Sequence, residues 1–233
     1  MRKNKWISLI VAILAVLLLV SCADLPKVHS MGQQATDVLY SMIFRKVDPK
    51  INIIAVDAKS EEAFGYFTSW DRSYAAELVE LLNQPEHKPA VIAFDLNYPT
   101  NRDPEGDAAF AKAAAEAGNV VVASRAEVYT RVVEENGSFV ENPFYVESFE
   151  YPYDALRAVT TYGFSNTAPD SDDVVRHAIL SLEHNGERMY SFSYQTYLKY
   201  MEFLGKEPYV PPVDGMNLYG IRYIAQPDNY NRV

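Results

Sequence analysis

The stretch VIAFDLNYPTNRDPEGDAAFAKA, residues 91–113, combines a strand-like run, a turn-rich loop and a helix-like tail. The apolar run ends at Asp95, the loop is crowded with Asn, Asp, Pro and Gly, and an alanine-rich segment continues to Gly118. A short apolar run bounded by turn residues predicts a buried strand, and a glycine after an alanine-rich segment is typical of a helix C-terminus. The stretch therefore predicts a strand, an ordered loop and a helix in immediate succession.

The same alternation extends to both sides of this stretch. INIIAVD (51–57) and NVVVASR (119–125) are short, apolar and rich in β-branched residues, which is typical of strands covered on both faces. Residues 31–47 and 73–84 carry apolar side chains at helical spacing. Strands that alternate with helices in this way indicate right-handed βαβ crossovers. We therefore expect a parallel α/β core up to about residue 125.

The second half of the chain has a different pattern. Asn-Gly pairs at 136–137 and 185–186 interrupt alternating segments, and this pair is the preferred two-residue hairpin turn. An amphipathic helix over 193–205, a proline-rich loop and a last strand over 218–225 follow. The predicted fold class is α/β, with a parallel βαβ core, an antiparallel β extension and one preceding N-terminal membrane helix.

That membrane helix is predicted from MRKNKWISLIVAILAVLLLVSCADLP, residues 1–26. A basic start precedes an uncharged apolar run, so a signal anchor would hold the start in the cytoplasm and place everything after about residue 25 outside. Two alternatives stay open: a lipoprotein signal, in which LVSC presents Cys22 for lipidation, and a cleaved secretory signal. All three export the body of the chain, which places it at the cell membrane or beyond.

Composition excludes several classes of function. The net charge is −10 and no cluster of Lys and Arg follows the first few residues, which argues against nucleic-acid binding. The single cysteine excludes internal disulfides and a zinc cluster. NRDPEGD resembles the start of a calcium loop, but Lys112 stands where a bidentate Glu is required. We therefore expect no metal and no cofactor.

The best candidate site residues are acidic residues at strand ends and the arginines that could pair with them. Asp57 and Asp95 each close an expected strand, and ligand sites in parallel sheets lie at these ends. They could bind a cation or perform acid–base chemistry, or they could cap helices and accept backbone N–H bonds. Because buried carboxylates need partners, we expect Arg72 and Arg176 to approach Asp57, Asp95 or Asp172.

For Asp95 the structural role is the stronger expectation. Its loop carries Pro99, Pro104 and Gly106, so the turn must be held in one shape before the helix begins. We expect the Asp95 carboxylate to accept hydrogen bonds from backbone N–H groups or an arginine. We expect no metal in the loop.

A series of motifs in this order resembles one known family. The matching positions are Asp37 and Arg45 after the anchor; Asp57, Ser60 and Gly65 in IAVDAKSEEAFG; Trp70 and Arg72 in SWDR; Asp95 and Asp107 in the opening stretch; Gly163, Asn166, Asp170, Asp172 and Arg176 in YGFSNTAPDSDDVVRHAIL; and the closing segment IRYIAQPDNYNRV. The series resembles CHASE type two (CHASE2), an extracellular sensory domain associated with bacterial cyclases and histidine kinases. The family's tryptophan–proline–tryptophan–x–arginine feature is incomplete here, because SWDR keeps Trp70 and Arg72 but lacks the proline, and Asp173 stands where a glycine is usual.

This resemblance implies an extracytoplasmic sensor domain over residues 31–233, after the anchor or signal at 1–25. Its implied partners are the cytoplasmic membrane, a small-molecule or other stimulus, and a second copy in the intact receptor. Family members continue into three membrane helices and an output module; we expect these 233 residues to be a truncated sensor without catalytic machinery. The rival hypotheses are a solute-binding lipoprotein anchored through Cys22 and a secreted hydrolase that uses Asp57 and Asp95.

Overall fold

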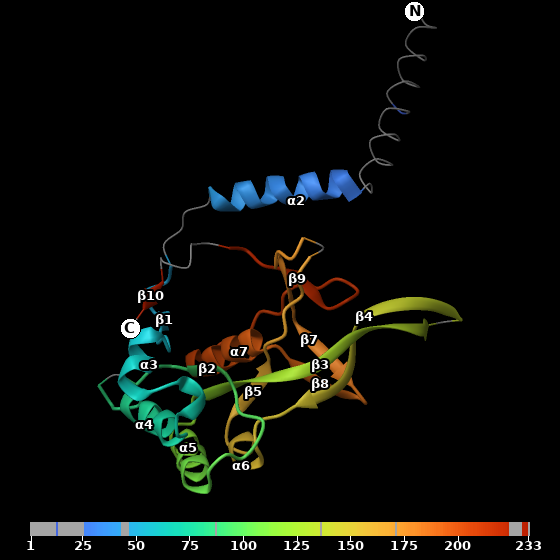
Figure 1. Cartoon of the computed structure of the whole chain (residues 1–233). Coiled ribbons are helices and arrows are strands. Elements are labelled where there is room, and N and C mark those ends of the chain that lie inside the picture. The colour runs from blue at the N-terminus through green and yellow to red at the C-terminus, as the bar shows by residue number, and fades with distance from the viewer. Residues whose placement is uncertain are drawn as a thin grey trace, which may run out of the picture. The chain divides into compact units, whose positions relative to one another are not determined.

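The computed structural model describes residues 13, 26–42, 47–86, 88–135, 137–170, 172–223 and 230–232 (Figure 1). The chain divides into two compact units, one of residues 1–55 with 222–233 and one of residues 56–221. The predicted membrane helix and Cys22 lie outside the described residues. Among the helices that are described, none has the length and apolar character needed to cross a bilayer.

The first unit contains helix α2 (Pro26–Ser41) and two short strands, β1 (Asn52–Ile53) and β10 (Asn231–Arg232). The helix predicted over 31–47 is present but begins earlier and ends at Ser41, while residues 43–46 lie outside the described part. β1 pairs in parallel with β10.

The expectation of a covered strand over 51–57 is wrong. Only Asn52 and Ile53 form a strand, and the side chain of Ile54 is 49% exposed. The partner of β1 is the two-residue strand β10, and Ile53 is itself 38% exposed.

The second unit is built on a parallel sheet of the order β2–β3–β5, which comprises β2 (Ile92–Asn97), the first part of β3 (Val120–Glu135) and β5 (Thr161–Phe164). Ile92 lies opposite Val120, and Val122 lies opposite Tyr162. The helical elements that precede and connect these strands are α3 (Ala58–Phe64), the 3₁₀ turn η1 (Phe67–Ser69), α4 (Ser73–Leu82), α5 (Pro104–Ala117) and α6 (Asp154–Arg157). The predicted parallel α/β core is therefore confirmed for this part of the chain.

The main core lies between this sheet and the helices α4 and α5, which lie side by side (Figure 1). Phe110 of α5 is fully buried, and its ring packs edge-on against Phe94 and Tyr98 at centroid distances of 5.3 and 5.2 Å. Val79 of α4 is also fully buried in this cluster. Each such side chain contributes roughly 1.5–3 kcal/mol through burial.

Both ends of α5 are capped, and the N-terminal cap also orders the loop before the helix. Asp103 is the N-cap, and its Oδ1 accepts the N–H of Gly106 at 2.6 Å. A Cβ on Gly106 would overlap the side-chain carboxylates of Asp71 and Asp103, which would have to shift to admit any other residue. Gly118 closes the helix in the left-handed region at φ 69°, as predicted.

The antiparallel extension is also confirmed. β3 continues past the sheet and pairs in antiparallel register with β4 (Ser138–Glu150), with Glu135 opposite Ser138; Asn136 of the predicted turn lies outside the described residues. β7 (Ser181–His184) and β8 (Glu187–Tyr190) form the hairpin predicted at Asn185–Gly186, where both residues have positive φ. β6 (His177–Ile179) pairs with β9 (Leu218–Gly220), and α7 (Phe192–Leu204) ends at Gly205 with φ 61°.

β5 differs from the pattern of that second half, because it joins β3 in parallel and so belongs to the α/β core. Its Gly163 lies where a Cβ would be 2.6 Å from the carbonyl oxygen of Tyr190. Such close backbone contact explains why glycine stands inside a strand at this position.

Candidate functional site

The buried ion pair of the second unit joins Arg72 and Asp107. Arg72 is the residue before α4, Asp107 lies in the first turn of α5, and Arg72 Nη1 donates to Asp107 Oδ1 at 2.5 Å. The two residues are 9% and 2% exposed. Arg72 Nη2 also donates to the carbonyl oxygen of Thr100 at 2.6 Å. One guanidinium therefore connects α4, α5 and the loop between β2 and α5.

The remaining bonding capacity of Asp107 is used by that same loop. Its Oδ2 accepts the backbone N–H of Arg102 at 2.8 Å and the side-chain amide of Asn101 at 3.1 Å. The hydroxyl of Tyr153 donates to the Asp107 carbonyl oxygen at 2.8 Å. Burial raises the pKa of Tyr153 to about 12, and the negative charge of Asp107 adds to the shift.

Two tyrosine rings complete the surroundings of the Arg72 guanidinium. It lies 4.7 Å from the ring centroid of Tyr153 and 5.4 Å from that of Tyr98. Burial also raises the pKa of Tyr98. Cation–π contacts of this kind, out of water, hold the guanidinium plane in place.

The structure does not assemble the predicted charge network around Asp57 and Asp95. Asp57 is the exposed N-cap of α3, where it accepts the N–H groups of Ser60 at 3.1 Å and Lys59 at 3.0 Å. These bonds lower the pKa of Asp57, the largest contribution coming from the Ser60 N–H. Arg72 pairs with Asp107 instead, a residue that strand-end reasoning did not single out.

Asp95 is an exposed residue inside β2, which continues for two residues beyond it. Alternation along the strand places Asp95 on the face opposite the buried Phe94. Within the described part of the chain, the Asp95 carboxylate has no hydrogen bond or ion pair, so the expectation that an arginine or backbone N–H groups hold it is wrong.

The expected approach of Arg176 to Asp172 is observed. Arg176 Nη1 and Nη2 donate to the two carboxylate oxygens of Asp172 at 2.8 Å each, and Nη1 also donates to Asp170 at 2.8 Å. Arg176 is 8% exposed. The hydrogen bonds from Arg176 lower the pKa of Asp172 to about 2.

Asp170 belongs to the same cluster. Burial alone would raise its pKa, but the hydrogen bonds from Arg176 and His177 outweigh that effect and lower it. Its Oδ1 lies 3.2 Å from Nδ1 of His177. A ligand-binding role for this cluster stays a prediction.

The loop of this cluster explains one departure from the family pattern. Asp173 has φ 61°, in the left-handed region, and its N–H donates to the carbonyl oxygen of Asp170 at 3.0 Å. Glycine adopts this conformation without strain, and aspartate is among the residues that tolerate it. The turn keeps its shape with Asp173 in the position that glycine usually occupies.

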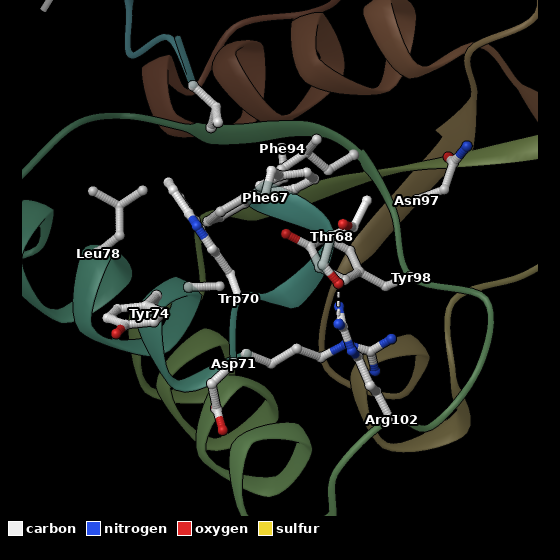
Figure 2. A pocket seen from close by; sticks show the side chains of 14 residues that line it. Phe67, Thr68, Trp70, Asp71, Tyr74, Leu78, Phe94, Asn97, Tyr98 and Arg102 are labelled. Atoms are coloured by element: carbon white, nitrogen blue, oxygen red, sulfur yellow. Dashed lines mark hydrogen bonds between the residues drawn. The ribbon is translucent and has the colours of Figure 1, made fainter. Parts of the chain in front are cut away.

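A cavity of about 330 Å³ lies beside the Arg72–Asp107 pair (Figure 2). Residues of η1, α4, β2 and the following loop line it: Val56, Phe67, Thr68, Trp70, Asp71, Arg72, Tyr74, Ala75, Leu78, Phe94, Leu96, Asn97, Tyr98 and Arg102. Most of this lining is apolar or aromatic. A concave, mostly apolar cavity with a few polar groups is the usual form of a small-molecule site.

Trp70 is the fixed wall of this cavity. Its indole N–H donates to the carbonyl oxygen of Gly65 at 2.7 Å, and its ring packs against Phe67 at a centroid distance of 5.4 Å. Tyr74 and Phe64 contact the same ring at 6.0 and 5.6 Å. These contacts hold the indole in one orientation.

Arg102 and Thr68 form the polar end of the cavity, and Figure 2 shows the Arg102 side chain reaching toward Thr68. Arg102 Nη2 donates to the carbonyl oxygen of Thr68. The Asp71 carboxylate points away from the cavity in the same view and accepts the N–H of Ser73 at 2.7 Å, which lowers the pKa of Asp71. In the described structure, no carboxylate forms an ion pair with Arg102.

Sequence reasoning missed this cavity and the role of Asp107. The available signals were the interleaved aromatic residues of YFTSW and the place of Asp107 in the family motif. The described residues contain no group of three or more His, Cys, Asp or Glu that could hold a metal ion.

The sequence matches the model of a known protein family. The family model of the CHASE2 domain matches residues 10–230, nearly the whole chain. No curated protein and no solved structure matches the chain.

Proposed function

Since the chain belongs to the CHASE2 domain family, a family of sensory domains in signalling receptors, we propose that it is the extracytoplasmic sensory domain of a bacterial membrane receptor. We further propose that the cavity beside Trp70 receives its stimulus. The family match over residues 10–230 is the observation that carries the proposal. CHASE2 is a sensory and not a catalytic family, which disfavours the hydrolase hypothesis.

The placement outside the cytoplasm is supported by the N-terminal sequence. Basic residues at 2, 3 and 5 precede an uncharged apolar run over 6–20, and positive charge before such a run favours a cytoplasmic start. A reporter that is active only in the cytoplasm, fused after Val233, should therefore be silent. An active fusion would contradict this part of the proposal.

The cavity suits a sensory role because of what surrounds it. Its volume of about 330 Å³ falls at the lower end of the usual range for ligand sites. Arg72 lies in its wall and connects α4, α5 and the β2–α5 loop. A ligand shifts a conformational equilibrium only by its differential affinity for the two states. A molecule that binds in the cavity and contacts Arg72 could therefore favour one arrangement of α4, α5 and the β2–α5 loop over another.

A thermal-shift screen of chemically diverse small molecules tests the cavity. The full chain is compared with Ala75→Trp, which fills the cavity, and with Ala108→Trp on the exposed side of α5 as the matched control. We expect stabilising compounds whose effect is lost in Ala75→Trp and retained in Ala108→Trp. Compounds that stabilise all three proteins equally would place the site elsewhere.

The second candidate function is a solute-binding lipoprotein, favoured by LVSC at 19–22. Lipidation at Cys22 predicts palmitate labelling that disappears in Cys22→Ala. An intact N-terminus in mass spectrometry would exclude this alternative and leave the signal anchor.

A further inference from the structure

We propose that the cavity beside Trp70 binds a small aromatic carboxylate, with its ring among Trp70, Tyr74 and Phe94 and its carboxylate on Arg102. The inference rests on the proposed function of this cavity as the sensory site, and it adds the chemical class of the ligand. It follows from two features of the lining: an aromatic body and the guanidinium of Arg102, which forms no ion pair within the described part of the chain.

The aromatic part of the cavity lining consists of rings that already pack edge-on against one another. Trp70 meets Phe67 and Tyr74 in T-shaped contacts at 5.4 and 6.0 Å, and Phe94 meets Tyr98 in the same way at 6.3 Å. Aromatic pairs prefer edge-to-face or offset geometries. A planar ring in the cavity can meet several of these edges and faces, while Ala75 and Leu78 supply aliphatic surface. An apolar ligand without a ring would gain the burial but lose the directional contacts.

The charge of the cavity comes from Arg102. The guanidinium of Arg72 is matched by Asp107 at 2.5 Å and therefore adds little net charge. Arg102 donates to the Thr68 carbonyl oxygen, which is neutral, and forms no ion pair within the described part of the chain. A guanidinium carries five N–H donors. Arg102 thus retains donors for a two-point contact with a carboxylate, the geometry that guanidinium groups favour.

The surroundings of Arg102 select a single negative charge over a double one. Asp71 lines the same cavity and lies close enough for its carboxylate to feel the charge of Arg102, and Asp103 follows Arg102 directly in the loop. These acidic residues disfavour a second negative charge, so a phosphate ester is matched less well than a carboxylate. A cationic amine would be repelled by the positive charge of the Arg102 guanidinium.

Calorimetric titration of the detergent-solubilised full chain tests the inference, with 2-naphthoate and indole-3-acetate as probes. Each acid is compared with its neutral carboxamide, and 2-naphthylmethylamine and 2-naphthyl phosphate serve as cationic and dianionic comparisons. We expect the acids to bind at least about tenfold more tightly than the amides, since a charge-assisted bidentate contact exceeds a neutral one. Added salt should weaken the acids and leave the amides almost unchanged.

Two variants locate the contact. Arg102→Gln should lower the affinity for the acids about tenfold and leave that for the amides unchanged, because it removes only the charge-assisted contact. The matched control is Arg125→Gln, another exposed arginine, whose side chain pairs with Glu127 at 3.5 Å. Both exposed substitutions should leave the melting temperature within error, and a normal melting curve confirms that the variant is folded.

The outcomes separate this inference from the proposed function. Amides, amine or phosphate that bind as tightly as the acids, with binding lost in Ala75→Trp, would overturn the carboxylate assignment and leave the cavity as the sensory site. An affinity for the acids that is unchanged in Ala75→Trp or in Arg102→Gln would overturn the inference. No heat with any probe at millimolar concentration would also overturn it, while the screen of diverse compounds decides on the cavity independently.

Discussion

The two buried arginines of the second unit are held in opposite ways. Arg72 pairs with Asp107, a residue 35 positions away on another helix, and both partners are almost fully buried. Arg176 pairs with Asp170 and Asp172, six and four positions before it, and the carboxylate of Asp172 is 39% exposed. The first pair joins separate elements of the fold, whereas the second shapes one loop.

This difference determines what each arginine contributes to stability. Removing one partner of a fully buried pair leaves an uncompensated charge away from water, which is among the most destabilising of single changes. Removing a cation from partly exposed carboxylates lets water replace its hydrogen bonds, so the loss is smaller. We therefore expect Arg72 to support the fold as a whole and Arg176 to support the 170–176 turn.

The largest expected effect is that of Arg72→Ala. It leaves the Asp107 carboxylate, which is 2% exposed, without its cation, and should lower the free energy of unfolding by about 3–5 kcal/mol. Urea denaturation followed by circular dichroism measures the change. Arg102→Ala on the neighbouring loop, where the side chain is exposed, is the control and should change it by less than about 0.5 kcal/mol.

Arg176→Ala should destabilise the protein less, by about 1.5–3 kcal/mol, the usual range for hydrogen bonds to charged groups. Arg188→Ala is the matched control, because Arg188 pairs with Glu183 at 3.1 Å with both side chains 57% exposed. The comparison between the two arginines fails if Arg176→Ala costs as much as Arg72→Ala under the same conditions.

Acid titration examines the same cluster without a mutation. The pKa of Asp172 is lowered from its ordinary value of 3.8 to about 2, and that of Asp170 is lowered as well. A carboxylate with a lowered pKa stabilises the fold above its unfolded pKa, and this contribution is lost as the pH falls toward its folded pKa. Stability should therefore decrease between about pH 4 and pH 2, and the slope should be flatter in Arg176→Ala. Equal slopes in both proteins would show that other groups dominate this pH range.

A change in the turn itself should have a smaller effect. Asp173 has φ 61°, so Asp173→Gly relieves strain but also loosens the unfolded chain. The net gain should be no more than about 1 kcal/mol. Asp173→Ala should have the opposite sign, since alanine keeps the Cβ and lacks the polar side chain that makes this conformation tolerable. Two substitutions with the same sign would show that the backbone conformation is not the cause.

The features that were predictable from the sequence are those with local causes. The turn at Asn185–Gly186, the helix end at Gly118 and the approach of Arg176 to Asp172 all involve residues a few positions apart, so a short stretch of sequence is enough to predict them. Asp107 and Arg72 meet because α4 and α5 pack together. The positions of these two residues along the chain do not indicate that contact, so it could not be predicted from the sequence.

The wrong prediction for residues 51–57 has a related cause. Their apolar run indicates a strand but does not name its partner, and burial depends on the partner. The described strand pairs with the two-residue β10, and the apolar side chains stay exposed. The cavity was missed for the same reason, because its lining comes from η1, α4, β2 and a loop.

Substitution of Asp95 should change the free energy of unfolding least of all. This residue belongs to a family motif, but its side chain does not make the contact that we expected from that motif. It lies in the stretch that predicts the fold, one residue after the buried Phe94, yet its own side chain is exposed, on the face of β2 opposite Phe94. A surface residue without a hydrogen bond or ion pair in the described structure should tolerate loss of its charge. Asp95→Asn should therefore change the free energy of unfolding by less than about 0.5 kcal/mol. The matched change Asp107→Asn, which disturbs the buried pair with Arg72, should cost several times more in the same urea titration. A loss above about 1 kcal/mol for Asp95→Asn would mean that a contact outside the described residues holds this carboxylate, and would return Asp95 to the candidate site.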